Sequence, residues 1–140
     1  MFRRGPIPPF VHGILDYVFA GLLIAAPFVL SFDDTAATAL SIALGLCAFI
    51  LGAFTAWTTG IVKSIPVVVH AMLDYLLSIF LVVSPFVLGF NDDDTASACF
   101  VVLGILGLVL TIATRYLPSS RTPRVPSGSE SGTEAPTPTA

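Results

Sequence analysis

The chain has 140 residues, of which 55% are hydrophobic and only 11% are charged, and its mean hydropathy is +0.92. So few polar side chains cannot cover the surface of a water-soluble globule, and the bilayer is the expected solvent. The formal net charge is -3 and the six basic residues form no run, which excludes the basic footprint of a nucleic-acid-binding protein. We therefore expect a multi-pass protein of the cell (inner) membrane, with the lipid bilayer as its partner and no nucleic acid.

The beginning of the chain recurs in its second half. Residues 7–32 align without gaps on residues 65–90, and 13 of the 26 positions are identical. An acidic turn follows each copy, at 33–35 and at 91–95, and the second turn is longer by two residues. A further apolar stretch comes after each turn, so each copy holds two apolar segments.

Each apolar segment has about 20 residues, the length that crosses a hydrocarbon core of about 30 Å. The sequence therefore predicts an all-α membrane protein with four transmembrane helices, arranged as two tandem helical hairpins that form parallel internal repeats. We expect the first repeat over 1–60 with spans at about 10–32 and 36–57, the second over 61–116 with spans at about 66–90 and 95–114, and a disordered, Pro/Ser/Thr-rich cytoplasmic tail over 117–140.

Basic residues near the span ends predict the orientation. All six lie on one side of the predicted membrane: Arg3, Arg4, Lys63, Arg115, Arg121 and Arg124. The opposite side carries the two acidic turns and no basic residue, so both termini are expected to be cytoplasmic. We expect the first apolar segment to be a span rather than a cleaved signal peptide, because the same segment recurs in mid-chain.

Ionisable side chains stand inside the first span of each copy, as His12 with Asp16 and again as His70 with Asp74. A spacing of four residues places both members of a pair on one face of a helix. Ionisable groups inside spans usually face the bundle interior or water. Both pairs are therefore expected to point inward, close to the cytoplasmic interface.

Three interpretations of these pairs compete. The favoured one is structural: each aspartate accepts hydrogen bonds from its own histidine, from Tyr17 or Tyr75, or from the other repeat. The second is a small polar site for a proton, a cation or a polar solute, because a histidine beside a carboxylate titrates near neutral pH. The third is metal or haem binding, since two histidines and two aspartates can ligate zinc. The duplication alone forces their symmetric placement, so no metal and no cofactor are predicted.

A proline followed by phenylalanine lies inside the first span of each copy, as Pro27 with Phe28 and as Pro85 with Phe86. Each proline removes one helical hydrogen bond and should kink or end its helix about two turns before the outer surface. The phenylalanines are then expected near the outer interface.

Small residues at helical spacing predict close helix packing, within the chain, in a homo-oligomer or against another membrane protein. They are Ala48, Gly52 and Ala56 in the second span and Gly104 and Gly107 in the fourth. The chain contains no GxSxG, HExxH, P-loop or Rossmann motif, so we expect no enzyme and no catalytic residues.

The segments around the two prolines, 26–32 and 84–90, and those around the His/Asp pairs, 11–17 and 69–75, resemble the SPW-repeat family of small prokaryotic membrane proteins. In that family a Ser-Pro-Trp motif lies in the first of two spans per repeat. Here Phe replaces Trp in both copies and Ala26 replaces Ser in the first. The resemblance covers both hairpins but not the tail. It implies an integral membrane protein with two repeats, and implies no substrate.

The leading hypothesis is a non-enzymatic scaffold or accessory subunit whose His/Asp pairs and prolines shape the bundle. The alternative is a small transporter or channel component for a proton, a cation or a small polar solute, acting alone or as an oligomer. In that case the four His/Asp groups would lie on its path.

Overall fold

The computed structural model describes residues 5–116. Its four helices are α1 (Pro9–Val29), α2 (Thr35–Ala53), α3 (Val67–Leu88) and α4 (Asp94–Ala113). All four are long and apolar enough to cross a membrane, which confirms the prediction of an all-helical protein with four such segments. The tail predicted over 117–140 lies outside the described residues.

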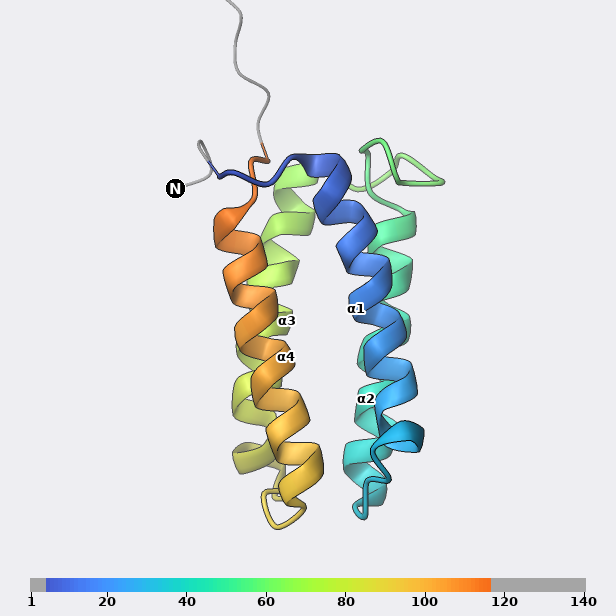
Figure 1. Cartoon of the computed structure of the whole chain (residues 1–140). Coiled ribbons are helices and arrows are strands. Elements are labelled where there is room, and N and C mark those ends of the chain that lie inside the picture. The colour runs from blue at the N-terminus through green and yellow to red at the C-terminus, as the bar shows by residue number, and fades with distance from the viewer. Residues whose placement is uncertain (1–4, 117–140) are drawn as a thin grey trace, which may run out of the picture.

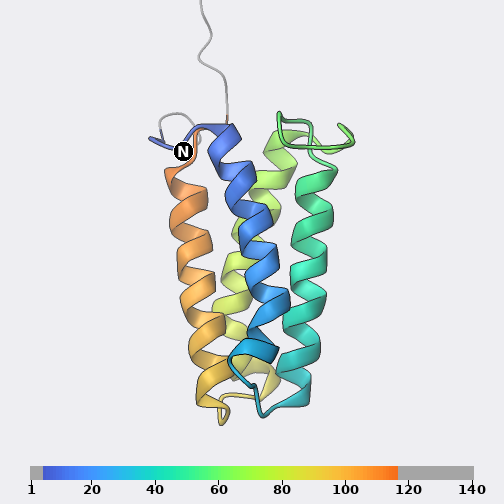
Figure 2. The ribbon, with the colours of Figure 1, turned by 45° about the vertical axis from the view of Figure 1, so that its right-hand side comes forward.

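The helices stand side by side as a bundle (Figures 1 and 2). α1 packs mainly against α2, and α3 packs mainly against α4, whereas the backbones of α1 and α3 do not approach each other closely. The start of α1, the end of α4 and the connection between α2 and α3 lie at one end of the bundle (Figure 1). The two acidic turns lie at the opposite end.

The first helix of each copy ends earlier than predicted. The prediction placed the ends of the first and third spans at residues 32 and 90, but α1 ends at Val29 and α3 at Leu88. The chain adopts a left-handed conformation shortly afterwards, with φ of 54° at Ser31 and 78° at Gly89, and this conformation cannot continue a right-handed helix.

Aspartates begin the second helix of each copy. The side chains of Asp34 and Asp93 accept hydrogen bonds from the backbone N–H groups of Ala37 and Ala96, at 2.7 and 2.9 Å, and so cap α2 and α4. Asp93 follows Asp34 by 59 positions, whereas the first helices of the two copies are offset by 58. The second copy therefore has one extra residue before its second helix, not two as predicted, and because α3 is longer than α1 by that residue, the connections 30–34 and 89–93 have equal lengths.

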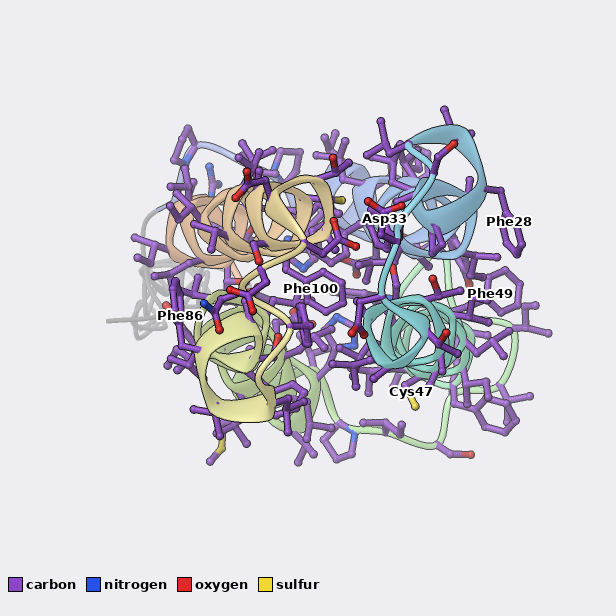
Figure 3. All side chains as sticks on the ribbon, turned by 90° about the horizontal axis from the view of Figure 1, so that it is seen from below. Phe28, Asp33, Cys47, Phe49, Phe86 and Phe100 are labelled. Carbon is purple, nitrogen blue, oxygen red and sulfur yellow. The ribbon has the colours of Figure 1, made fainter. Side chains whose placement is uncertain are left out.

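The interior of the bundle is apolar toward the acidic turns. Leu23, Leu81 and Phe100 are fully buried, and Phe100 lies at the centre of the bundle when it is viewed from that end (Figure 3). Most of the predicted small residues are buried at helix contacts, namely Ala48, Gly52, Gly104 and Gly107. Ala56 is exposed and lies beyond the end of α2, so its predicted packing role was wrong.

Short backbone pairings tie the ends of the repeats together at the other end of the bundle. Ile7, before α1, donates its N–H to Ala113 O at 3.1 Å and accepts from the N–H of Arg115 at 3.0 Å. Ile65, before α3, forms the matching bridge to Thr55, after α2. Each repeat thus begins beside the end of the other repeat.

Candidate functional site

The two His/Asp pairs meet in a single cluster between α1 and α3. His12 and His70 are 1% exposed, and the side chains of Asp16 and Asp74 are 13% and 12% exposed. The Nε2 atom of each histidine lies close to both carboxylates. The distances are 3.3 Å for His12–Asp16, 3.2 Å for His12–Asp74, 3.2 Å for His70–Asp16 and 3.1 Å for His70–Asp74. Each carboxylate therefore contacts the histidine of its own repeat and that of the other.

The second ring nitrogen of each histidine is held by a threonine of the other repeat. His12 Nδ1 lies 2.8 Å from Thr114 Oγ1, and His70 Nδ1 lies 2.8 Å from Thr55 Oγ1. Each hydroxyl donates its one hydrogen to the carbonyl four residues earlier, at 2.7 and 2.6 Å, so toward the imidazole it can only accept. Both Nδ1 atoms therefore carry hydrogen, and both Nε2 atoms face the carboxylates.

Two aromatic side chains cover the cluster. The ring centroid of Trp57 lies 4.2 Å from that of His70, and the ring centroid of Tyr116 lies 5.3 Å from that of His12. The Tyr116 hydroxyl lies 3.3 Å from His12 Nε2 and donates to Asp74 at 3.4 Å. Burial, together with the nearby Asp74 charge, raises the pKa of Tyr116, so the phenol remains a protonated donor.

The two predicted tyrosines lie at the edge of this arrangement. Tyr17 donates its hydroxyl hydrogen to the backbone carbonyl of Thr59 at 3.0 Å, so that hydrogen is not available to Asp16. The Tyr17 ring packs against Phe49. Tyr75 is half-buried on α3, next to Asp74 in the chain.

A cavity of about 30 Å³ adjoins the cluster. Its walls include all four ionisable side chains together with apolar and small residues of α1, α2, α3 and α4. That volume suits roughly one water molecule, which the surrounding polar atoms would hold.

The proline–phenylalanine motifs lie far from the cluster, at the acidic-turn end. Pro27 and Pro85 are buried in the last turn of their helices, so each lies where its helix ends, which is one of the two outcomes predicted for it. Phe28 and Phe86 are 70% and 67% exposed and point outward from opposite sides of the bundle (Figure 3). The motif therefore contributes no side chain to the polar cluster.

Sequence reasoning missed the two threonines and the two covering aromatic residues. A signal was present, because Thr55 and Trp57 recur as Thr114 and Tyr116 with the 59-residue offset of the second helices. The gap-free alignment ended before the acidic turns, where the offset changes. Both Thr-x-aromatic pairs also lie at the ends of predicted spans rather than inside them.

The outward side chains of all four helices are mostly large and apolar, as expected for surfaces that face lipid. This surface and the four helices of spanning length indicate a multi-pass membrane protein. The chain belongs to the SPW repeat domain family, whose model matches residues 10–114. No curated protein and no solved structure matches the chain.

Proposed function

We propose that the protein is a non-enzymatic integral membrane protein, a scaffold or accessory subunit, in which the polar cluster braces two hairpin repeats against each other. The observation that carries this proposal is the exchange of partners between the repeats: His12 contacts Asp74, and His70 contacts Asp16, each at 3.2 Å. The backbones of α1 and α3 do not approach each other closely, so the two helices are joined here through these side chains.

We further propose that both hairpins have the same orientation, with both termini in the cytoplasm. Lys63 and Arg115 belong to the end of the bundle where α1 begins, and the acidic turns with Asp33 and Asp92 belong to the other end. This distribution of charge agrees with the preference for basic residues on the cytoplasmic side.

The geometry favours bracing over transport. The histidines are almost fully buried, Trp57 and Tyr116 cover them, and the adjoining cavity has room for about one water molecule. A path for a solute or a hydrated ion needs more space than this. The four groups are instead engaged with one another and with the two threonines.

The bracing role is tested by two pairs of substitutions. Asp16→Leu and Asp74→Leu each remove one of the two carboxylates and leave both buried histidines to share the other, at a cost of about 1–3 kcal/mol. Asp16→Asn and Asp74→Asn keep an acceptor of similar size and should cost less. Asp92→Leu, in an exposed turn, is the control for adding an apolar side chain. Thermal unfolding in detergent at two pH values measures all five variants.

The outcomes separate the competing functions. Lower melting temperatures for the Leu variants, with smaller losses for Asn, support bracing. Melting temperatures equal to that of the parent in all four cluster variants contradict it. If Asn preserved the melting temperature and abolished a pH-dependent or ion-dependent flux in proteoliposomes, the transport alternative would replace the proposal.

The accessory role is tested by isolation from native membrane in a mild detergent. The expected result is a complex heavier than one chain, with either a second copy or another membrane protein. A mass equal to one chain in its detergent micelle, across mild detergents and after cross-linking in the membrane, contradicts an accessory role.

A further inference from the structure

We propose that the cluster of His12, Asp16, His70 and Asp74 binds a divalent transition-metal ion, Zn²⁺ above others, between the two repeats. Each residue offers one ligand atom, and the four atoms all lie within 4.8 Å of one another. Ligands about 2.0–2.1 Å from a tetrahedral zinc ion lie about 3.3 Å apart. Three Nε2–oxygen distances join one set of four such atoms, with Asp16 Oδ2 and Asp74 Oδ2 as the oxygens, and at 3.1–3.2 Å they already have this spacing. The remaining pairs of ligand atoms lie at most 4.8 Å apart, and side-chain shifts on the order of 1 Å would bring them to the tetrahedral spacing.

The threonines present the correct nitrogen of each ring to the ion. Because both Nδ1 atoms donate to Thr55 or Thr114, a neutral imidazole has its lone pair on Nε2, which faces two carboxylate oxygens. A lone pair aimed at two anionic oxygens is repulsive unless a proton or a cation lies between them. Metal-bound histidines are commonly held in this way through their other ring nitrogen.

Charge balance also favours a divalent ion. Two neutral imidazoles and two carboxylates carry a charge of -2, which is costly inside a membrane bundle. One divalent cation cancels that charge. Two imidazole nitrogens among the ligands favour zinc over Mg²⁺ and Ca²⁺, which prefer oxygen, and a tetrahedral arrangement disfavours Cu²⁺, which prefers a tetragonal one.

The competing arrangement places one proton on each Nε2 and forms two imidazolium–carboxylate pairs from the same residues. The metal inference rests on the proposed bracing role, because the ion would join the same two helices. The experiment must therefore distinguish a brace without metal from the absence of a brace.

The first test uses the full chain, purified in detergent and stripped with a chelator. We expect one Zn²⁺ bound per chain, a higher melting temperature with Zn²⁺ than with Mg²⁺, and release of the ion as acid protonates the ligands. Co²⁺ serves as a spectroscopic probe, and its visible absorption should have the intensity of four-coordinate cobalt. No stoichiometric Zn²⁺ binding, or a six-coordinate Co²⁺ spectrum, overturns the proposal.

The second test uses variants. The double variant Asp16→Asn with Asp74→Asn should lose stoichiometric binding, and unchanged affinity would place the metal elsewhere and overturn the proposal. Thr114→Val removes the acceptor for His12 and should weaken Zn²⁺ binding 10- to 100-fold. Thr35→Val is the control for the substitution itself, because Thr35 is exposed at the first residue of α2, at the acidic-turn end of the bundle. Equal affinity of the two threonine variants also overturns it.

The two proposals fail in different ways. If the parent binds no Zn²⁺ while Asp16→Leu and Asp74→Leu still melt at lower temperature, the bracing role is kept and protonated histidines take the place of the metal ion. If those Leu variants melt like the parent, the bracing role itself is lost.

Discussion

The Ser41 hydroxyl donates a 2.6 Å hydrogen bond to the backbone carbonyl of Leu23. That carbonyl lacks its helical donor, because Pro27 stands four residues later and has no N–H. In the second repeat, the carbonyl four residues before Pro85 also lacks its helical donor, and Ser84 of the same helix donates a 3.1 Å hydrogen bond to it. The serine of the Ser-Pro pair is replaced by alanine in the first copy, and a serine of α2 supplies the bond instead.

Ser41→Ala should therefore destabilise the bundle by about 1 kcal/mol, the usual size of such a bond inside a membrane protein. Adding Ala26→Ser, which restores the arrangement of the second repeat, should recover most of the loss. Unfolding in mixed detergent measures both. If the double variant is no more stable than Ser41→Ala alone, the freed carbonyl is not the cause of the loss.

Asp93 links the two acidic turns, and its ionisation should affect stability. One carboxylate oxygen caps α4 through Ala96, and the other accepts from the backbone N–H groups of Asp33 and Asp34 at 2.8 and 3.0 Å. Burial alone would raise the pKa of Asp93, but these backbone donors lower it. Because the pKa of Asp93 is lower in the folded state than in the unfolded state, its charged carboxylate stabilises the fold at pH values above the unfolded pKa of about 3.9. This stabilisation is lost as the pH falls through the folded pKa.

The Asp93→Asn variant should accordingly melt below the parent at neutral pH, and the difference should narrow as pH falls below about 4. Asp92→Asn, in the exposed part of the same turn, should follow the parent throughout. Thermal unfolding in detergent over this range of pH provides the measurement. A difference for Asp93→Asn that is independent of pH would show that the charge is not responsible.

One glycine in each helix pair sets the distance between the two helices. A Cβ atom at Gly45 would lie 2.8 Å from Ala20 O, and one at Gly104 would lie 2.8 Å from Ser78 O. Gly45→Ala and Gly104→Ala should each cost about 1–3 kcal/mol, because backbone atoms cannot give way easily. Gly21→Ala is the control, since nothing lies within 4 Å of its Cβ position. Equal melting of all three variants would refute this account of the packing.

The proposed orientation predicts the positions of reporters fused to the chain. Reporters after Lys63 and after Arg121 should be cytoplasmic, and one in the turn of Asp92 to Asp94 should be external, because basic residues mark the inner side. Paired phosphatase and fluorescent-protein fusions provide the measurement. A cytoplasmic reading in the turn would overturn the four-span topology.

The sequence predicted the elements better than it predicted their partners. The His-x-x-x-Asp spacing placed His12 and Asp16 on one face, since that relationship is local to one helix. The contact between His12 and Asp74 depends on how α1 and α3 face each other, which no spacing along the chain specifies. Thr114 was missed for the same reason: its hydrogen bond to His12 joins residues 102 positions apart.

Helix ends were predicted less well than helix positions, for a local reason. Apolar residues continue past Val29 and Leu88, so hydropathy extends the spans, whereas the backbone turns at Ser31 and Gly89. The caps at Asp34 and Asp93 follow from side-chain oxygens that accept from N–H groups three residues later. Reading those caps from the sequence would have given the correct offset between the second helices.

The pairing of Ile7 with Thr114 has a consequence for the order of the repeats. It joins the end of the second repeat to the start of the first, just as Ile65 joins Thr55 where the chain is continuous. The two repeats therefore form a closed ring in space. The chain ends now lie where α4 meets α1, and the connection between α2 and α3 is an equivalent place for them. A circularly permuted gene that starts at α3, and joins residue 116 to residue 5 so that the path from Thr114 to Ile7 is as long as the 56–64 loop, should encode the same bundle.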